Sequence, residues 1–160
     1  MHICVIYTSP KLGDLILQLP FIKAIANKYN TKVTLCINKH INIKDILSKQ
    51  EYIDSIIENS FRRGIYFFPD VFRLVRNLRK KKFEIAFVLE KTKGPVLACK
   101  LAGVKNIFGF GIGSQKYFVN KFTTLIKDDL KYNYTEQSIK FLKKLNINFN
   151  FNDQFLVIDR

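Results

Sequence analysis

The sequence holds few of the residues that mark several classes of protein. It has three cysteines, seven glycines, four prolines and no tryptophan in 160 residues. Cys4, Cys36 and Cys99 are odd in number, far apart and set in apolar surroundings. This excludes a disulfide framework or a zinc motif and predicts buried thiols in a reducing compartment. With 48% apolar residues and little glycine or proline, the chain is not a disordered tail, and we expect one domain over residues 1–160.

Long hydrophobic runs are also missing. The longest apolar stretches fall far short of the about 20 residues that a membrane-spanning helix needs. Lys11 and Asp14 interrupt the N-terminal stretch that would otherwise resemble a secretory signal. We therefore expect a soluble or peripheral protein with a cytoplasmic location.

Acidic residues are scarce. The chain has 13 Asp and Glu against 27 Lys and Arg, a net charge of +14, which favours an anionic partner. Lysine, isoleucine and asparagine are all abundant, so biased base composition is an alternative explanation of the charge. Only clustered charges are therefore informative.

The stretch from Met1 to Tyr29 organises the rest of the chain. The apolar run Ile3 to Tyr7 predicts a strand, and apolar residues at helical spacing follow from Leu15. In an open parallel sheet, the loop after the first strand faces the ligand crevice. The segment from Thr8 to Asp14 is therefore where we expect chemistry.

Strands and helices are expected to alternate through the remaining sequence. This predicts an α/β fold, a Rossmann-like three-layer domain with a mainly parallel sheet. Asp70 is expected to cap its helix, and Asn133 with Glu136 to form a capping box. The expected strands are 32–38, 53–57, 83–89, 106–110 and 155–158, and the expected helices are 42–50, one from 70, 92–102 and 134–145.

Positive charge clusters in two neighbouring segments. The irregular, aromatic-rich segment 61–68 is either a contact loop or cover for the core. The helix after it carries a basic side that is either a binding surface or an ordinary solvated face. Neither segment shows the aromatic and basic strand face of a nucleic-acid-binding domain, so no nucleic acid is expected as a partner. The clustered residues are Arg62, Arg63, Arg73, Arg76 and Lys80 to Lys82.

Three segments together resemble the N-terminal half of family 9 glycosyltransferases, the lipopolysaccharide heptosyltransferases. They read TSPKLGDLILQLPFIKAI, FEIAFVLEKTKGPVLACKLAGVKNIFGF and YTEQSIKFLKKLNI. Val88 to Lys91 stand where the family has Asp-x-Gln-Gly. The matching motif residues are Gly13, Asp14, Pro20, Leu101, Ala102, Gly103, Gly109 and Phe110.

This resemblance implies an inverting enzyme with the two facing domains of a GT-B fold, needing neither metal nor cofactor. The N-terminal domain would bind an anionic lipid A or inner-core glycolipid at the inner membrane, which implies peripheral membrane association. The donor, ADP-heptose or another sugar nucleotide, would bind a C-terminal domain that is absent from this chain. A separate donor-binding subunit is therefore an expected partner, without which the chain could be inactive. The alternative is a non-catalytic basic domain that binds anionic glycolipid or a membrane surface.

The resemblance also assigns roles to residues. Asp14 would be the general base that accepts the proton of the acceptor hydroxyl, and Gly13 would let the backbone approach a ligand. From the residues alone, the favoured role of Asp14 is to cap its helix. With the resemblance, the two roles are expected to coexist, since a cap also fixes the base in place. The other residues expected to bind substrate are Ser9, Lys11, Gly111, Gly113, Arg62 and Arg63.

Overall fold

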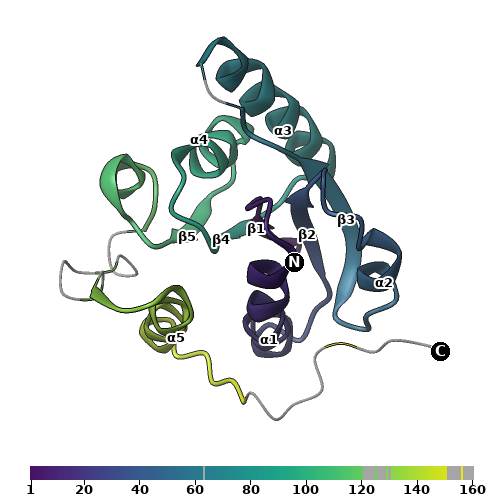
Figure 1. Ribbon diagram of the computed structural model, residues 1–160, viewed down its shortest axis with the longest axis vertical. Coiled ribbons are helices and arrows are strands. Elements are labelled where there is room, and N and C mark those ends of the chain that lie inside the picture. The colour runs from purple at the N-terminus through teal and green to yellow at the C-terminus, as the bar shows by residue number, and fades with distance from the viewer. Residues whose placement is uncertain (63, 121–124, 126–128, 130, 151–155, 157–160) are drawn as a thin grey trace.

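A computed structural model describes residues 1–62, 64–120, 125, 129, 131–150 and 156. Five parallel strands form one sheet with helices on both faces, as Figure 1 shows, which confirms the expected α/β class. The strands are β1 Ile3–Tyr7, β2 Val33–Asn38, β3 Ile53–Asn59, β4 Ile85–Val88 and β5 Asn106–Gly109. The α-helices are α1 Leu12–Lys28, α2 Lys44–Ser48, α3 Phe67–Lys81, α4 Lys93–Ala102 and α5 Tyr134–Lys144, and two short 3₁₀ helices are η1 Gly64–Tyr66 and η2 Gly113–Tyr117.

The strand order is β3-β2-β1-β4-β5. The chain therefore winds outward from β1 to β3 and then crosses back to place β4 on the other side of β1. This reversal leaves the carboxyl ends of β1 and β4 side by side, with Ile6 in register with Val88. In open parallel sheets such a switch point is where ligands bind.

Side chains of β1 alternate between the two faces of the sheet, as strand geometry requires. Val5 and Tyr7 pack in a core with α1, α2 and α5, and Cys4 and Ile6 pack in a second core under α3 and α4 (Figure 1). Cys36 and Cys99 lie in that second core too, so the expectation of buried thiols is confirmed. Burial raises the pKa of Cys99 to about 12.

Helix α1 starts earlier than the sequence predicts. It begins at Leu12, so the expected loop from Thr8 to Asp14 is wrong beyond Lys11. Gly13 and Asp14 lie in the first turn of the helix. Lys11 is at the cap position, and within the described part of the chain its side chain makes no capping hydrogen bond. Capping preferences did not indicate this start, because lysine, which occupies the cap position, is not a preferred capping residue.

The expected ends of α4 and α5 are confirmed. Asn133 Oδ1 accepts from the Glu136 backbone N–H at 2.9 Å, and Glu136 Oε2 accepts from the Asn133 N–H at 3.2 Å, which completes the capping box. Gly103 and Asn146 have φ values of 85° and 53°, the left-handed conformation that terminates helices. The strand expected at 155–158 falls almost wholly outside the described residues.

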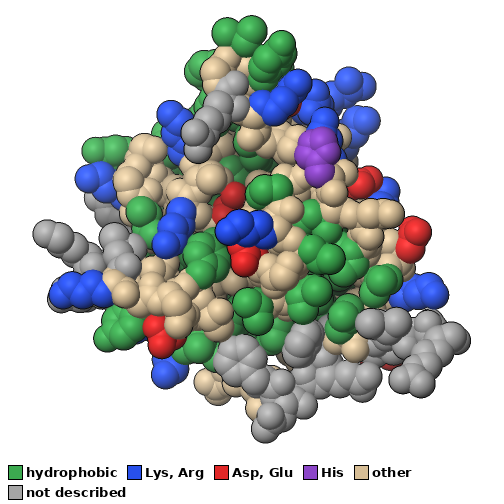
Figure 2. All heavy atoms as spheres, in the orientation of Figure 1, with side chains coloured by type: hydrophobic (Ala, Val, Ile, Leu, Met, Phe, Trp, Pro, Cys, Tyr) green, Lys and Arg blue, Asp and Glu red, His purple; other side chains and the backbone are tan. Residues whose placement is uncertain are grey.

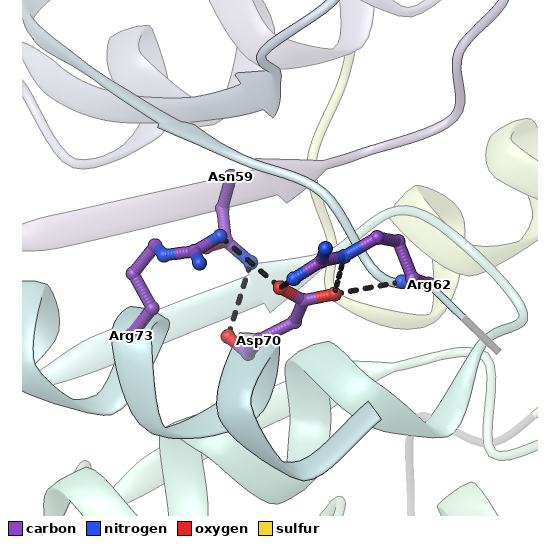
Figure 3. Close-up of polar contacts among 4 residues, drawn as sticks. All are labelled: Asn59, Arg62, Asp70 and Arg73. Carbon is purple, nitrogen blue, oxygen red and sulfur yellow. Dashed lines mark hydrogen bonds and ion pairs between the residues drawn. The ribbon is translucent and has the colours of Figure 1, made fainter. Parts of the chain in front are cut away.

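Asp70 does not cap α3, which starts at Phe67. Its carboxylate is fully buried and accepts from Arg62 Nε at 3.0 Å, Arg62 Nη2 at 2.9 Å and the Arg62 backbone N–H at 2.9 Å (Figure 3). Arg73 Nη1 adds a bond of 3.1 Å, and Asn59 Nδ2 donates to the Asp70 carbonyl at 3.4 Å. The capping prediction was wrong because these donors occupy the carboxylate. The cluster instead ties the segment after β3 to α3.

Replacing Asp70 by Ala should lower the free energy of unfolding by about 2 kcal/mol, because charged hydrogen bonds are lost. The bonds from Arg62 lower the pKa of Asp70 from 3.8 to about 2. The folded protein therefore binds this proton less tightly than the unfolded chain. The stabilisation is complete above pH 3.8 and is lost as the pH falls towards 2. Denaturant midpoints between pH 7 and pH 2 measure both effects, with exposed Asp45→Ala as the control. A stability of Asp70→Ala that matches this control would contradict the account.

Candidate functional site at the β1–β4 switch point

A buried carboxylate joins the ends of β1 and β4. Glu90 follows β4, and its Oε1 accepts from the Thr8 backbone N–H at 2.8 Å and from Thr8 Oγ1 at 2.7 Å. Its Oε2 accepts from Thr92 Oγ1 at 2.6 Å. Glu90 is only 5% exposed, and this burial raises its pKa despite the three hydrogen bonds, which act in the opposite direction. Glu90 therefore clamps the turn that leads from β1 into α1.

Neighbouring side chains hold the same backbone in place. Gln115 Nε2 donates to the carbonyl oxygens of Glu90 and Thr92, both at 2.7 Å, and Asn38 Nδ2 donates to the Thr8 carbonyl at 2.8 Å. The Tyr134 hydroxyl donates to the Leu89 carbonyl at 2.5 Å. Side chains from β2, η2 and α5 thus fix the strand ends at the switch point. A site on this frame is preorganised, because its backbone positions are set by several elements.

Asp14 lies beside this frame, in the first turn of α1, and its side chain is half-buried. The free backbone N–H groups of that turn favour a negative charge at this place. The charges of Asp14 and Glu90 both raise the pKa values of Tyr7 and Tyr134, although burial is the largest cause for each tyrosine. The two carboxyl groups and the two phenols therefore occupy one electrostatic neighbourhood. Asp14 is accessible while Glu90 is enclosed, so only Asp14 can meet a ligand directly.

Two tyrosines form the apolar side of this neighbourhood. The rings of Tyr7 and Tyr134 lie edge to face with centroids 6.1 Å apart, and Phe110 packs on Tyr134 at 5.6 Å. Ser9 hydrogen-bonds the Tyr7 hydroxyl, which moderates the effect of burial, and the pKa of Tyr7 is about 12. Both phenols therefore stay protonated at neutral pH and can act as hydrogen-bond donors. Lys91 Nζ lies 5.3 Å from the centre of the Tyr134 ring and brings positive charge to the rim.

The structure brings most of the predicted site residues to this one edge. Ser9, Lys11 and Gly13 lie on the connection from β1 into α1, next to Asp14. A Cβ added at Gly13 would meet no atom of the described residues within 4 Å, so the space beside it is open to a ligand. Gly111 and Gly113 follow β5 and have φ values of 69° and 58°, which favour glycine.

The predicted basic contacts lie elsewhere along the edge. Arg62 follows β3, which β2 separates from β1, and its guanidinium is held by Asp70. The side chain still has 45% of its surface exposed. Arg63 lies outside the described residues. Arg62 is thus held in place beside the end of β3, and β2 lies between it and the end of β1, where Asp14 is.

Glu90, Gln115 and the two tyrosines were not predicted as site residues. One signal was present for Glu90, because an acidic residue directly after an apolar parallel strand falls at the crevice edge. Hollows of about 370 and 540 Å³ lie at the opposite, amino edge of the sheet, near Thr31 and Lys32. We place the site at the carboxyl edge, where the carboxylates and the strand reversal meet. In the described ranges, no group of three His, Cys, Asp or Glu side chains could hold a metal ion.

Comparison with known proteins bears on the fold. No protein-family model and no curated protein matches the chain. Among solved structures, it is similar to a family 9 glycosyl transferase from Veillonella parvula, with a TM-score of 0.73 and 19% identity over 92% of this chain and 41% of that one. It is similar to E. coli ADP-heptose lps heptosyltransferase II, with a TM-score of 0.64 and 19% identity over 86% and 40% of the two chains.

A third similar structure is E. coli heptosyltransferase WaaC with ADP-2-deoxy-2-fluoro heptose, with a TM-score of 0.65 and 15% identity over 96% of this chain and 51% of that one. The chain thus spans between 40% and 51% of the length of these glycosyltransferases. This share fits their N-terminal half. The resemblance to family 9 glycosyltransferases is therefore confirmed at the level of the fold, and the chain has the fold of one half of a GT-B glycosyltransferase.

Proposed function

We propose that this chain provides the acceptor-binding half of an inverting glycosyltransferase that transfers heptose from ADP-heptose to a lipid A or inner-core glycolipid. The observation that carries the proposal is the placement of Asp14. It is an accessible carboxylate in the first turn of α1, beside the strand reversal and next to a rigid polar frame. The similarity to solved heptosyltransferases supports the choice of donor.

In the proposed reaction, the acceptor hydroxyl oxygen attacks the anomeric carbon of the heptose. The bond from that carbon to the diphosphate oxygen breaks, and its electron pair leaves with ADP. The hydroxyl proton passes to the carboxylate of Asp14, which acts as general base. Attack opposite to the leaving group inverts the anomeric centre. No metal or cofactor takes part in this scheme.

The other residues of the edge take supporting roles. Ser9 and Lys11 flank the attack site, and Gly13 leaves room for the acceptor beside the helix. Gly111 and Gly113 present backbone N–H groups that can approach the donor diphosphate. Glu90 touches neither substrate and acts by holding Thr8, and through it the turn before Asp14.

The donor would be bound mainly by a second domain outside these 160 residues, either on a separate polypeptide or in a longer form of the protein. Arg62 and Arg63 would meet the acidic groups of the acceptor. The Asp70 cluster fixes the orientation of the Arg62 guanidinium through Nε and Nη2, which leaves its Nη1 end to meet a phosphate group.

Calorimetric titration tests whether this chain binds the acceptor while another domain binds the donor. The chain should bind a deacylated, water-soluble form of the acceptor and bind ADP-heptose only weakly, because the diphosphate site belongs mainly to the other half. Arg62→Gln should weaken acceptor binding and leave the weak donor binding unchanged. Micromolar affinity for ADP-heptose without acceptor binding would contradict the assignment of this domain to the acceptor.

A further inference from the structure

Four large side chains project from η1 and the start of α3. Ile65 is 81% exposed, Phe68 61%, Phe72 60% and Tyr66 50%. We call these four residues the apolar tip. The segment lies at the top of the molecule in Figure 1, and Figure 2 shows hydrophobic side chains gathered there. An exposed apolar group of this size marks an interaction surface more often than isolated exposed residues do.

Positive charge adjoins the apolar tip. Between residues 61 and 82 the sequence has eight Lys or Arg and a single acid, Asp70, which is buried. Figure 2 shows Lys and Arg side chains beside the hydrophobic group at the top of the molecule. Arg76, Arg79 and Lys80 are exposed and line an open hollow of about 500 Å³ together with Phe72. The apolar tip thus continues directly into a basic surface.

The helical spacing of α3 separates three kinds of surface. Val71, Leu74 and Leu78 are buried against the sheet. Phe68, Phe72 and Arg76 recur every four residues and form one exposed row, apolar in its first half and basic in its second. A row of this kind can lie against the interface of a bilayer, with its apolar side chains below the headgroups and its cations beside the phosphates.

Contacts within the segment hold two of the four residues of the apolar tip, Tyr66 and Phe68. Arg62, held by Asp70, lies over the Tyr66 ring with its guanidinium carbon 4.4 Å from the ring centre (Figure 3 shows the Arg62–Asp70 pairing). The ring of Phe67 packs edge to face on Phe68, with centroids 5.4 Å apart. Less side-chain ordering is therefore needed at these two positions when the tip meets a partner, which favours binding.

We propose that the apolar tip and the adjoining basic residues Arg76, Arg79 and Lys80 dock this domain on an anionic phospholipid surface. The combination of charges and apolar side chains identifies this partner. A nucleic acid would use the cations but would give Ile65 no apolar surroundings. A second copy of this chain would place like charges opposite each other. No helix among the described residues could cross a bilayer, and the proposed contact is confined to the interface.

Co-sedimentation with vesicles tests the proposal. The vesicles are made of equimolar phosphatidylcholine and phosphatidylglycerol, or of phosphatidylcholine alone, and contain no glycolipid acceptor. The result is therefore independent of glycosyl transfer. The chain should bind the anionic vesicles and bind the neutral ones at least about fivefold more weakly, because each cation near an anionic surface contributes about that factor.

The double variant Phe68→Ser, Phe72→Ser should bind anionic vesicles at least about tenfold more weakly, because two aromatic side chains are no longer buried in lipid. A matched control is Leu17→Ser, Tyr117→Ser, since these residues are 53% and 73% exposed on other elements. The control should bind like the wild type. Arg76→Gln, Lys80→Gln should weaken binding and reduce its salt dependence.

Three results would overturn the proposal. The first is equal binding of the phenylalanine variant and its control, and the second is equal binding to both kinds of vesicle. The third is the absence of vesicle binding together with self-association that the phenylalanine variant abolishes, which would make the apolar tip a contact between copies of this chain. Size-exclusion chromatography of the same variants reads out that last result.

Discussion

Asp14→Asn is expected to lower the turnover of heptose transfer by about 10²- to 10⁴-fold, because an amide cannot accept the proton of the acceptor hydroxyl. Asparagine has nearly the shape of aspartate, and Asp14 lies inside the first turn of α1, where Lys11 and not Asp14 occupies the cap position. The fold should therefore persist. Turnover is measured with ADP-heptose and a lipid A acceptor, for the chain combined with a donor-binding domain, beside denaturant midpoints.

Asp45→Asn provides a matched control. Asp45 is an exposed acid in the first turn of α2, so its loss has the same kind of effect on a helix N-terminus. That effect is at most about 1 kcal/mol in stability, with no change in turnover. Near-normal turnover of Asp14→Asn would refute the catalytic role and leave Asp14 a structural residue.

The second large effect concerns Glu90. Glu90→Ala should lower the free energy of unfolding by about 3 kcal/mol, because the buried Thr8 N–H loses its acceptor and a cavity forms. Exposed Glu84→Ala, directly before β4, should change the free energy of unfolding by no more than about 0.5 kcal/mol. Denaturant midpoints measure both variants. Equal stability of the two would mean that the clamp between β1 and β4 contributes nothing.

The titration of Glu90 gives that prediction a second test. Burial raises the pKa of Glu90 above its ordinary value of 4.5, so the folded protein binds this proton more tightly than the unfolded chain. The contribution of Glu90 to stability is therefore most favourable below pH 4.5 and declines as the pH rises through the pKa of the folded state. Glu90→Gln keeps the shape and removes the titration. As the pH rises above 4.5, the free energy of unfolding of Glu90→Gln should fall less than that of the wild type. The same dependence on pH in both proteins would contradict the raised pKa of Glu90.

The fold could be predicted from the sequence because local patterns agree with it. The apolar run of β4 and the capping box at Asn133 are signals within a few residues, and both are confirmed. The starts of α1 and α3 were not predicted, since Lys11 and Tyr66 are poor capping residues whose helices are set by packing. The role of Asp70 was not predicted either, because Arg62 binds the carboxylate that was expected to cap α3.

The site was predictable only in part. Asp14 could be found because it follows the first strand and matches a family motif. The role of Glu90 depends on Thr8, which lies 82 residues away in the sequence, and on a burial that no local pattern reveals. The exposure of Phe68 and Phe72 was not predicted, because aromatic residues near the start of a helix usually belong to the core.

The central claim is that this domain presents an acceptor and a base to a donor held by another domain. The most direct measurement follows the transfer of labelled heptose from ADP-heptose to a lipid A acceptor. The account predicts transfer when the chain is mixed with the donor-binding domain of a heptosyltransferase, and none with either part alone. Absence of transfer from the mixture, while the chain binds the acceptor and the added domain binds ADP-heptose, would contradict it.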